Sequence, residues 1–90
     1  MTNNREIETL KSELSKTLSN LIQLLVDEPD DVVVDMMASQ SGTLLINIQV
    51  NKADIGKVIG KKGNHANALR TLICAIVAPY NYRAILEIHE

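Results

Sequence analysis

The run from Leu44 to Val50 constrains the fold more than any other segment, because its apolar positions recur at every second residue. A period of two is typical of a β-strand with one buried face, whereas a helix repeats after about 3.6 residues. The apolar positions of the run are Leu44, Ile46, Ile48 and Val50. We therefore predict a strand at 44–50 that packs one face against the rest of the protein.

The segments around this strand predict three helices and two further strands. The first helix begins at Asn3 or Asn4, either of which can cap it, and ends at the sequence DEPDD, which contains Pro29. Its apolar residues step by three or four and form one stripe: Ile7, Leu10, Leu14, Leu18, Leu21 and Leu25. The remaining strands are predicted at 32–38 and 83–89, and the remaining helices at 52–59 and from 64 to about 78.

The order of these elements, α-β-β-α-α-β, predicts the topology of the sheet. The turn sequence SQSG joins strands 32–38 and 44–50, so we expect an antiparallel hairpin. Two helices separate strand 44–50 from strand 83–89, so these two strands should be parallel through a right-handed crossover. The expected fold class is α+β, with a three-stranded mixed sheet covered on one face by three helices. Residues 1–4 are expected to form a flexible tail before a single domain at 5–90.

The composition excludes several functional classes. One cysteine and two histidines are too few for a disulfide scaffold or a structural zinc site, so no metal or other cofactor is expected. No apolar run is long enough for a membrane helix, and the polar first residues lack the core of a signal peptide. No carboxylate pair or catalytic triad is recognisable. We expect a cytoplasmic protein that is not an enzyme and that has no small-molecule substrate and no membrane association.

The charges are distributed unevenly along the chain. The formal net charge is −2, but residues 1–35 hold three basic and eight acidic side chains, whereas residues 51–83 hold six basic and one acidic. A local basic patch can bind phosphate whatever the total charge. The segment 51–83 is therefore the expected binding region for an anionic partner.

Within that region the sequence GKKG, from Gly60 to Gly63, links two predicted helices. Glycines at both ends allow the backbone to approach a sugar-phosphate chain closely, and Lys61 and Lys62 add positive charge. The following helix begins at Asn64 and directs its unpaired N–H groups and positive dipole end to the same place. This arrangement indicates a phosphate cradle. The alternative is a plain turn whose lysines only maintain solubility.

Residues beside the loop are candidates for further contacts. Lys57 and Arg70 flank it on the two helices and could extend the phosphate contacts, or they could be ordinary solvated residues. Ile59 could form part of the apolar floor of a base-binding groove. The chain has only two aromatic residues, both tyrosines, so base stacking on several aromatic rings is excluded.

The strings VIGKKG and ALRTL, with the acidic DEPDDVVV segment and the final RAILEI strand, resemble the small bacterial RNA-binding proteins of the KhpA family. The resemblance implies a type II KH domain over residues 5–90, whose GXXG loop clamps the backbone of about four nucleotides of single-stranded RNA. It also implies a cytoplasmic protein without catalysis that self-associates or pairs with a larger KH protein of the Jag/KhpB type. Reported roles of the family include post-transcriptional control or RNA chaperoning and links to cell shape and division.

Two features of the sequence depart from the family pattern. Asn64 stands where relatives usually carry a basic residue, which should weaken phosphate binding. The first helix also begins about a dozen residues earlier than in relatives.

The predicted third helix has a second apolar ridge beside its core-facing side. Ala68, Leu72 and Ala75 form this ridge, at spacings of four and three. They suggest a helix-to-helix contact between two copies of the chain, unless the first helix covers them. A pure interaction module with little RNA binding is therefore the second hypothesis. A helix-turn-helix DNA binder is disfavoured, because the basic charge is concentrated at the loop and not along the second helix of the pair.

Overall fold

The structure, a computed structural model, describes residues 4–90 and contains the six predicted elements in the predicted order. The helices are α1 (Asn4–Leu25), α2 (Ile55–Ile59) and α3 (Asn64–Val77), and the strands are β1 (Val33–Ala38), β2 (Thr43–Gln49) and β3 (Arg83–His89). The expected tail at 1–4 lies outside the described residues except for Asn4, which is the first residue of α1.

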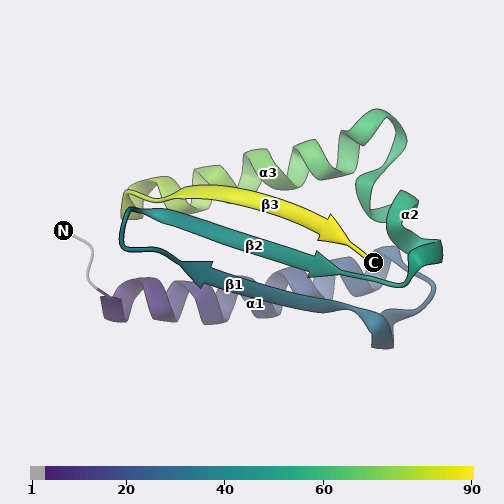
Figure 1. The fold of residues 1–90 in the computed structure, drawn as a ribbon, viewed down its shortest axis with the longest axis horizontal. Coiled ribbons are helices and arrows are strands. Elements are labelled where there is room, and N and C mark those ends of the chain that lie inside the picture. The colour runs from purple at the N-terminus through teal and green to yellow at the C-terminus, as the bar shows by residue number, and fades with distance from the viewer. Residues whose placement is uncertain (1–3) are drawn as a thin grey trace.

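The three strands form one mixed sheet in the order β1-β2-β3. β1 is antiparallel to β2, and β2 is parallel to β3, so Ile46 of β2 lies between Met36 and Leu86. Both pairings are confirmed as predicted. In Figure 1, α1 and α3 run behind the strands along the sheet, and α2 lies at one end of the molecule. The helices thus form one layer on one face of a three-stranded sheet.

The core lies between the sheet and the helices. Leu44, Ile46 and Ile48, the inward positions of β2, are completely buried. β3 contributes Leu86, and α2 contributes Val58, which is completely buried. The remaining buried side chains of the helical layer come from α1 and α3: Ile7, Leu14, Leu18, Ile22, Leu69, Ile73 and Val77. The alternating residues of 44–50 therefore lie at the centre of the core, as their period of two predicted.

The buried stripe of α1 differs from the prediction at its C-terminal end. Ile22 is completely buried, whereas Leu21 is 42% exposed and Leu25 is also exposed. From Leu14 the buried positions advance by four residues at a time, which keeps Ile22 and not Leu21 on the sheet-facing side. Leu21 and Leu25 are therefore left on a neighbouring face of α1.

Candidate functional site

The loop from Gly60 to Gly63 connects α2 to α3 through a single tight turn. The Gly60 N–H donates to the Gly56 carbonyl at 2.9 Å and ends α2, and the Gly63 N–H donates to the Gly60 carbonyl at 3.0 Å. Three residues with positive φ turn the chain: Gly60 at φ 79° and ψ 167°, Lys62 at φ 57° and Gly63 at φ 74°. L-residues rarely adopt positive φ, so the turn depends on its glycines.

The two glycines are required for different reasons. A Cβ built on Gly60 would lie 2.5 Å from Cγ of His65 and 2.8 Å from the His65 backbone nitrogen. A Cβ on Gly63 would meet only the Asn67 side chain, at 3.8 Å. Gly60 therefore permits both an unusual backbone conformation and a close packing contact, whereas Gly63 permits only the conformation.

The lysines of the loop are available to a ligand. Lys61 and Lys62 are exposed, and neither side chain forms an ion pair within residues 4–90. Gly63 is the N-cap of α3 and provides no side-chain acceptor for the N–H groups of the first turn. Two ammonium groups and an uncapped helix N-terminus therefore concentrate positive potential at one point of the surface.

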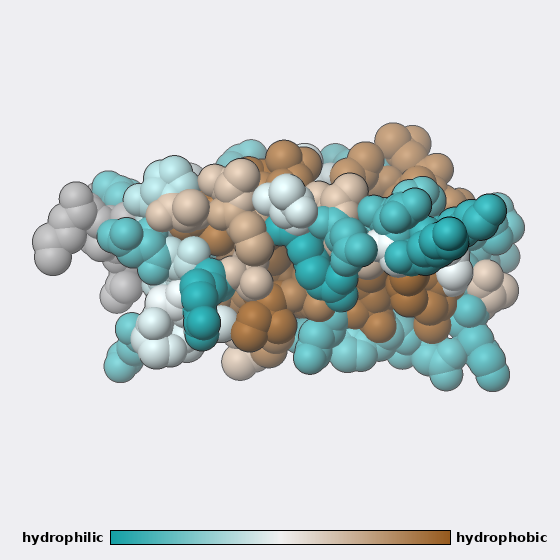
Figure 2. Space-filling view, turned by 90° about the horizontal axis from the view of Figure 1, so that it is seen from above, coloured by the Kyte–Doolittle hydropathy of each residue, from teal (hydrophilic) through white to brown (hydrophobic). Residues whose placement is uncertain are grey.

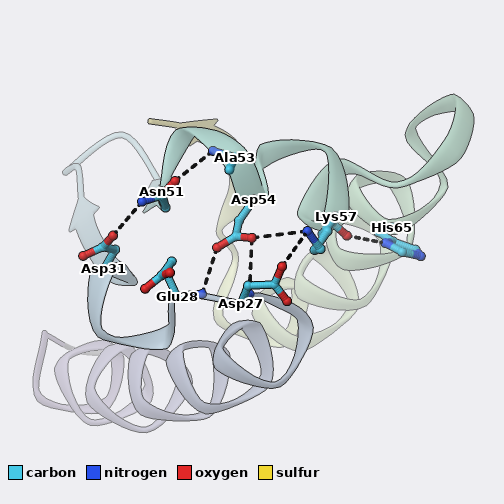
Figure 3. A network of polar contacts seen from close by, with 8 residues as sticks. All are labelled: Asp27, Glu28, Asp31, Asn51, Ala53, Asp54, Lys57 and His65. Carbon is cyan, nitrogen blue, oxygen red and sulfur yellow. Dashed lines mark hydrogen bonds and ion pairs between the residues drawn. The ribbon is translucent and has the colours of Figure 1, made fainter.

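Lys57, a predicted ligand contact, has two acidic partners on the side of α2 that faces the end of α1. Its Nζ lies 3.1 Å from Oδ2 of Asp27 and 3.5 Å from Oδ1 of Asp54. The hydrogen bond to Asp27 and the attraction of both carboxylates, partly opposed by desolvation, raise the pKa of Lys57. Its charge is therefore largely committed to an internal network (Figure 3).

Asp54 is the only buried charged residue recorded for the described chain, and it holds α2 against the junction between α1 and β1. Its two carboxylate oxygens accept hydrogen bonds from the N–H groups of Asp27 at 3.2 Å and Glu28 at 3.0 Å. Burial raises the pKa of Asp54, but these two donors and the Lys57 ammonium outweigh burial, so the pKa lies below the ordinary value. In the sequence, Asp54 stands in the first turn of the helix predicted at 52–59, and nothing in that pattern indicates that its carboxylate is buried.

The other predicted contact residues surround the loop at different depths. Asn64 is exposed at the start of α3, and Ile59 is half-buried at the end of α2. Arg70 is exposed two turns farther along α3, where its Nη1 donates to Oδ1 of Asn67 at 3.1 Å. Asn64, Asn67 and Arg70 are spaced by three, so they form a polar row that continues from the loop along α3.

From the sequence alone, a phosphate contact by His65 is conceivable but disfavoured at a helix N-terminus, and the structure shows a different contact. Its ring packs over Gly60, and its Nδ1 lies 2.8 Å from the Lys57 carbonyl oxygen at the end of α2. A histidine two residues after the second glycine was visible in the sequence, but nothing in the pattern indicated that its ring turns back to α2.

The apolar ridge of α3 is exposed and borders a groove. Ala68 and Ala75 are exposed, Leu72 is 57% exposed, and α1 therefore does not cover them. A groove of about 260 Å³ lies between α1 and α3, with Leu21, Leu25, His65, Ala68, Leu69 and Leu72 as its lining. In Figure 2, apolar surface adjoins hydrophilic surface at the end of the molecule that carries α2 and the loop.

Among residues 4–90 there is no group of three or more histidine, cysteine or acidic side chains that could hold a metal ion. None of the described helices is both long and apolar enough to span a membrane.

Proteins similar to this chain in sequence are known from several bacteria. The family model for the KH domain of KhpA/KhpB matches residues 15–88, which include the second half of α1, all of β1, β2, α2, the loop and α3, and β3 up to Ile88. The RNA-binding protein KhpA of Borreliella burgdorferi is 38% identical over 68 residues, with 76% of this chain and 82% of the relative covered. The proteins of the same name from Chlamydia pneumoniae and Listeria monocytogenes are 36% and 35% identical, and each alignment covers 86% of this chain and 97% or 100% of the relative. The chain belongs to the KhpA/KhpB family of KH-domain proteins.

Proposed function

We propose that this protein binds short single-stranded RNA by clamping about four nucleotides of its backbone at the loop from Gly60 to Gly63. The observation that carries the proposal is the loop itself. It has three residues at positive φ and two exposed lysines that have no ion-pair partner among residues 4–90, and it leads into a helix whose N-cap residue has no side chain. The relatives bear the name RNA-binding protein, which agrees with this use of the loop.

The residues around the loop have distinct roles in the proposed complex. The glycines let the RNA backbone approach, and Lys61 and Lys62 neutralise its phosphates. Asn64 and Arg70 extend the contact along α3 as hydrogen-bond and charge donors, and Ile59 provides an apolar edge for a base. Lys57 contributes less than the loop lysines, because two carboxylates already hold its ammonium group.

We further propose that the protein acts as a dimer in the cytoplasm, in post-transcriptional regulation or as an RNA chaperone. The exposed ridge of Ala68, Leu72 and Ala75 forms the centre of the contact, and Leu21 of α1 enlarges the apolar surface beside it. A larger KH protein of the Jag/KhpB type could occupy the same ridge in a heterodimer. The family's links to cell shape and division would then follow from the RNAs that such a dimer holds.

The experiment that tests RNA binding reverses the charge of the loop. A variant with Lys61→Asp and Lys62→Asp should lose affinity for single-stranded RNA in fluorescence anisotropy and should keep its circular dichroism spectrum, because both side chains are exposed. Aspartate also tolerates the positive φ at position 62 better than most residues. The matched control, Lys16→Asp with Lys52→Asp, makes the same change in net charge at two exposed positions outside the loop and should bind normally.

The salt dependence gives a second readout. If about three phosphates are neutralised, the slope of log affinity against log salt should be about −2 for a single strand. The loop variant should show a flatter slope.

The alternative function is an interaction module that binds little RNA of its own. The exposed groove between α1 and α3 favours this candidate, because its lining gathers the exposed side chains of Leu21, Leu25 and Leu72 where a partner could cover them. A loop variant that binds RNA as well as the parent would favour the interaction module.

A further inference from the structure

The ring of His65 lies next to the loop, and its hydrogen bond to the Lys57 carbonyl determines which ring nitrogen carries the proton. Its Nδ1 lies 2.8 Å from the Lys57 carbonyl oxygen, and a carbonyl oxygen can only accept a hydrogen bond. Nδ1 therefore carries the proton and donates. The neutral ring then has an unprotonated Nε2, which is an acceptor.

The position of the ring directs this acceptor away from the protein. The ring packs over Gly60, so it lies against the first glycine of the loop. In Figure 3 the edge of the ring that carries Nδ1 faces the Lys57 carbonyl, and the opposite edge points away from the network. His65 is exposed, and Nε2 has no hydrogen-bond partner in the described part of the chain.

An acceptor at this place is poorly matched to a phosphate, which has no proton to donate. The loop lysines already provide donors for phosphate oxygens. The group beside each phosphate that can donate is the ribose 2′-hydroxyl, which RNA has and DNA lacks.

We propose that Nε2 of His65 accepts a hydrogen bond from the 2′-hydroxyl of a nucleotide whose phosphate lies on the loop, and that His65 thereby makes the protein prefer RNA over DNA. The inference rests on the proposed RNA-binding function of the loop. It assigns His65 a role in the choice of sugar, whereas the lysines act on the phosphates that both nucleic acids share.

The first test needs no substitution. One unstructured eight-nucleotide sequence is prepared as RNA, as DNA and as 2′-O-methyl RNA, and each form is titrated with the parent protein at pH 8. Loss of one neutral hydrogen bond corresponds to a loss of affinity of about three- to tenfold. The DNA and the 2′-O-methyl RNA should therefore both bind about three- to tenfold more weakly than the RNA.

The second test removes the acceptor and keeps the donor. In His65→Asn, the side-chain amide can donate to the Lys57 carbonyl in place of Nδ1, and no atom remains at the position of Nε2. The variant should bind the DNA as the parent does, and its RNA-to-DNA affinity ratio should fall by about three- to tenfold. Circular dichroism confirms that the variant is folded.

The results separate this inference from the function on which it rests. If the parent binds RNA and 2′-O-methyl RNA equally, or if folded His65→Asn keeps the parent's ratio, the role of His65 is refuted although the loop still binds nucleic acid. If the parent binds none of the three oligonucleotides, the proposed function of the loop fails and the role of His65 fails with it.

Discussion

Replacement of Gly60 by alanine tests whether the loop has the packing described here. Gly60 has φ 79° and ψ 167°, a combination that only glycine adopts without strain. The new methyl group would lie 2.5 Å from Cγ of His65 and 2.8 Å from the backbone nitrogen of the same residue. The ring can rotate away, but the backbone nitrogen belongs to the first turn of α3 and cannot move without shifting that helix.

The expected cost follows from these two terms. Residues forced into a glycine-only region cost about 1 to 3 kcal/mol each, and the contact with the α3 backbone adds to this. Reduced freedom of the unfolded chain returns about 0.4 to 1 kcal/mol, so we expect a net loss of about 3 kcal/mol in the free energy of unfolding. Gly63→Ala is the matched control, because its φ of 74° carries an ordinary left-handed penalty and its methyl group would meet nothing closer than 3.8 Å. Its net loss should be about 1 kcal/mol.

Urea denaturation followed by circular dichroism measures both losses. In a domain of this size, 1 kcal/mol corresponds to a shift of about 4 to 8 °C in the melting temperature, so the two variants are easily distinguished. His65→Ala isolates the ring: in that background the cost of Gly60→Ala should decrease by about 1 kcal/mol, while the part caused by the backbone remains. Equal losses for Gly60→Ala and Gly63→Ala would refute the packing argument.

Three further predictions concern the ridge, the network and the backbone of the loop. Leu72→Asp should convert a dimer into a folded monomer in sedimentation velocity, with Thr71→Asp as an exposed control on the neighbouring face, and a parent that is monomeric at high concentration would contradict the proposed interface. Asp54→Asn should lower the free energy of unfolding above about pH 4. Because the pKa of Asp54 is lowered, its contribution is complete above the ordinary value of 3.8 and is lost as the pH falls through the folded-state pKa, so parent and variant should converge in acid. Gly63→Ala should weaken RNA binding more than its small effect on stability suggests, and unchanged affinity would show that this glycine serves only the turn.

Most of the fold could be predicted because local patterns and topology agreed. The alternation in β2, the turn after β1 and the two helices before β3 each allowed few arrangements, and both strand pairings are confirmed. The end of α1 was predicted less well, since steps of three and of four were both compatible with its leucines. Packing against the sheet selected Ile22 and left Leu21 exposed, and periodicity alone could not make that choice.

The geometry of the loop follows from the sequence more directly than the contacts around the loop do. Gly60 and Gly63 both have positive φ, a conformation that glycine adopts without steric cost, so the residue types at these two positions account for the turn. Lys57 has two carboxylate partners. Asp27 lies just after the end of α1, whereas Asp54 is three residues before Lys57 in the sequence. The contact with Asp27, about 30 positions away, depends on tertiary packing, and for that reason the nearer of the two carboxylate partners of Lys57 could not be identified from its neighbours in sequence.

The parallel pairing of β2 with β3 has a consequence for how the protein folds. Ile46 and Leu86 pair across the sheet, and the whole segment of α2, loop and α3 lies between them in the sequence. The β1–β2 hairpin closes a short turn, whereas β3 can join only after a long chain segment has been closed, which carries the larger entropic cost. We therefore expect the hairpin to form early and the loop to acquire its final geometry only when β3 docks. Amide hydrogens of α2 and α3 should then exchange with solvent through the same global unfolding as those of β3. Bound RNA stabilises the folded state, so it would slow exchange across the sheet as well as at the loop.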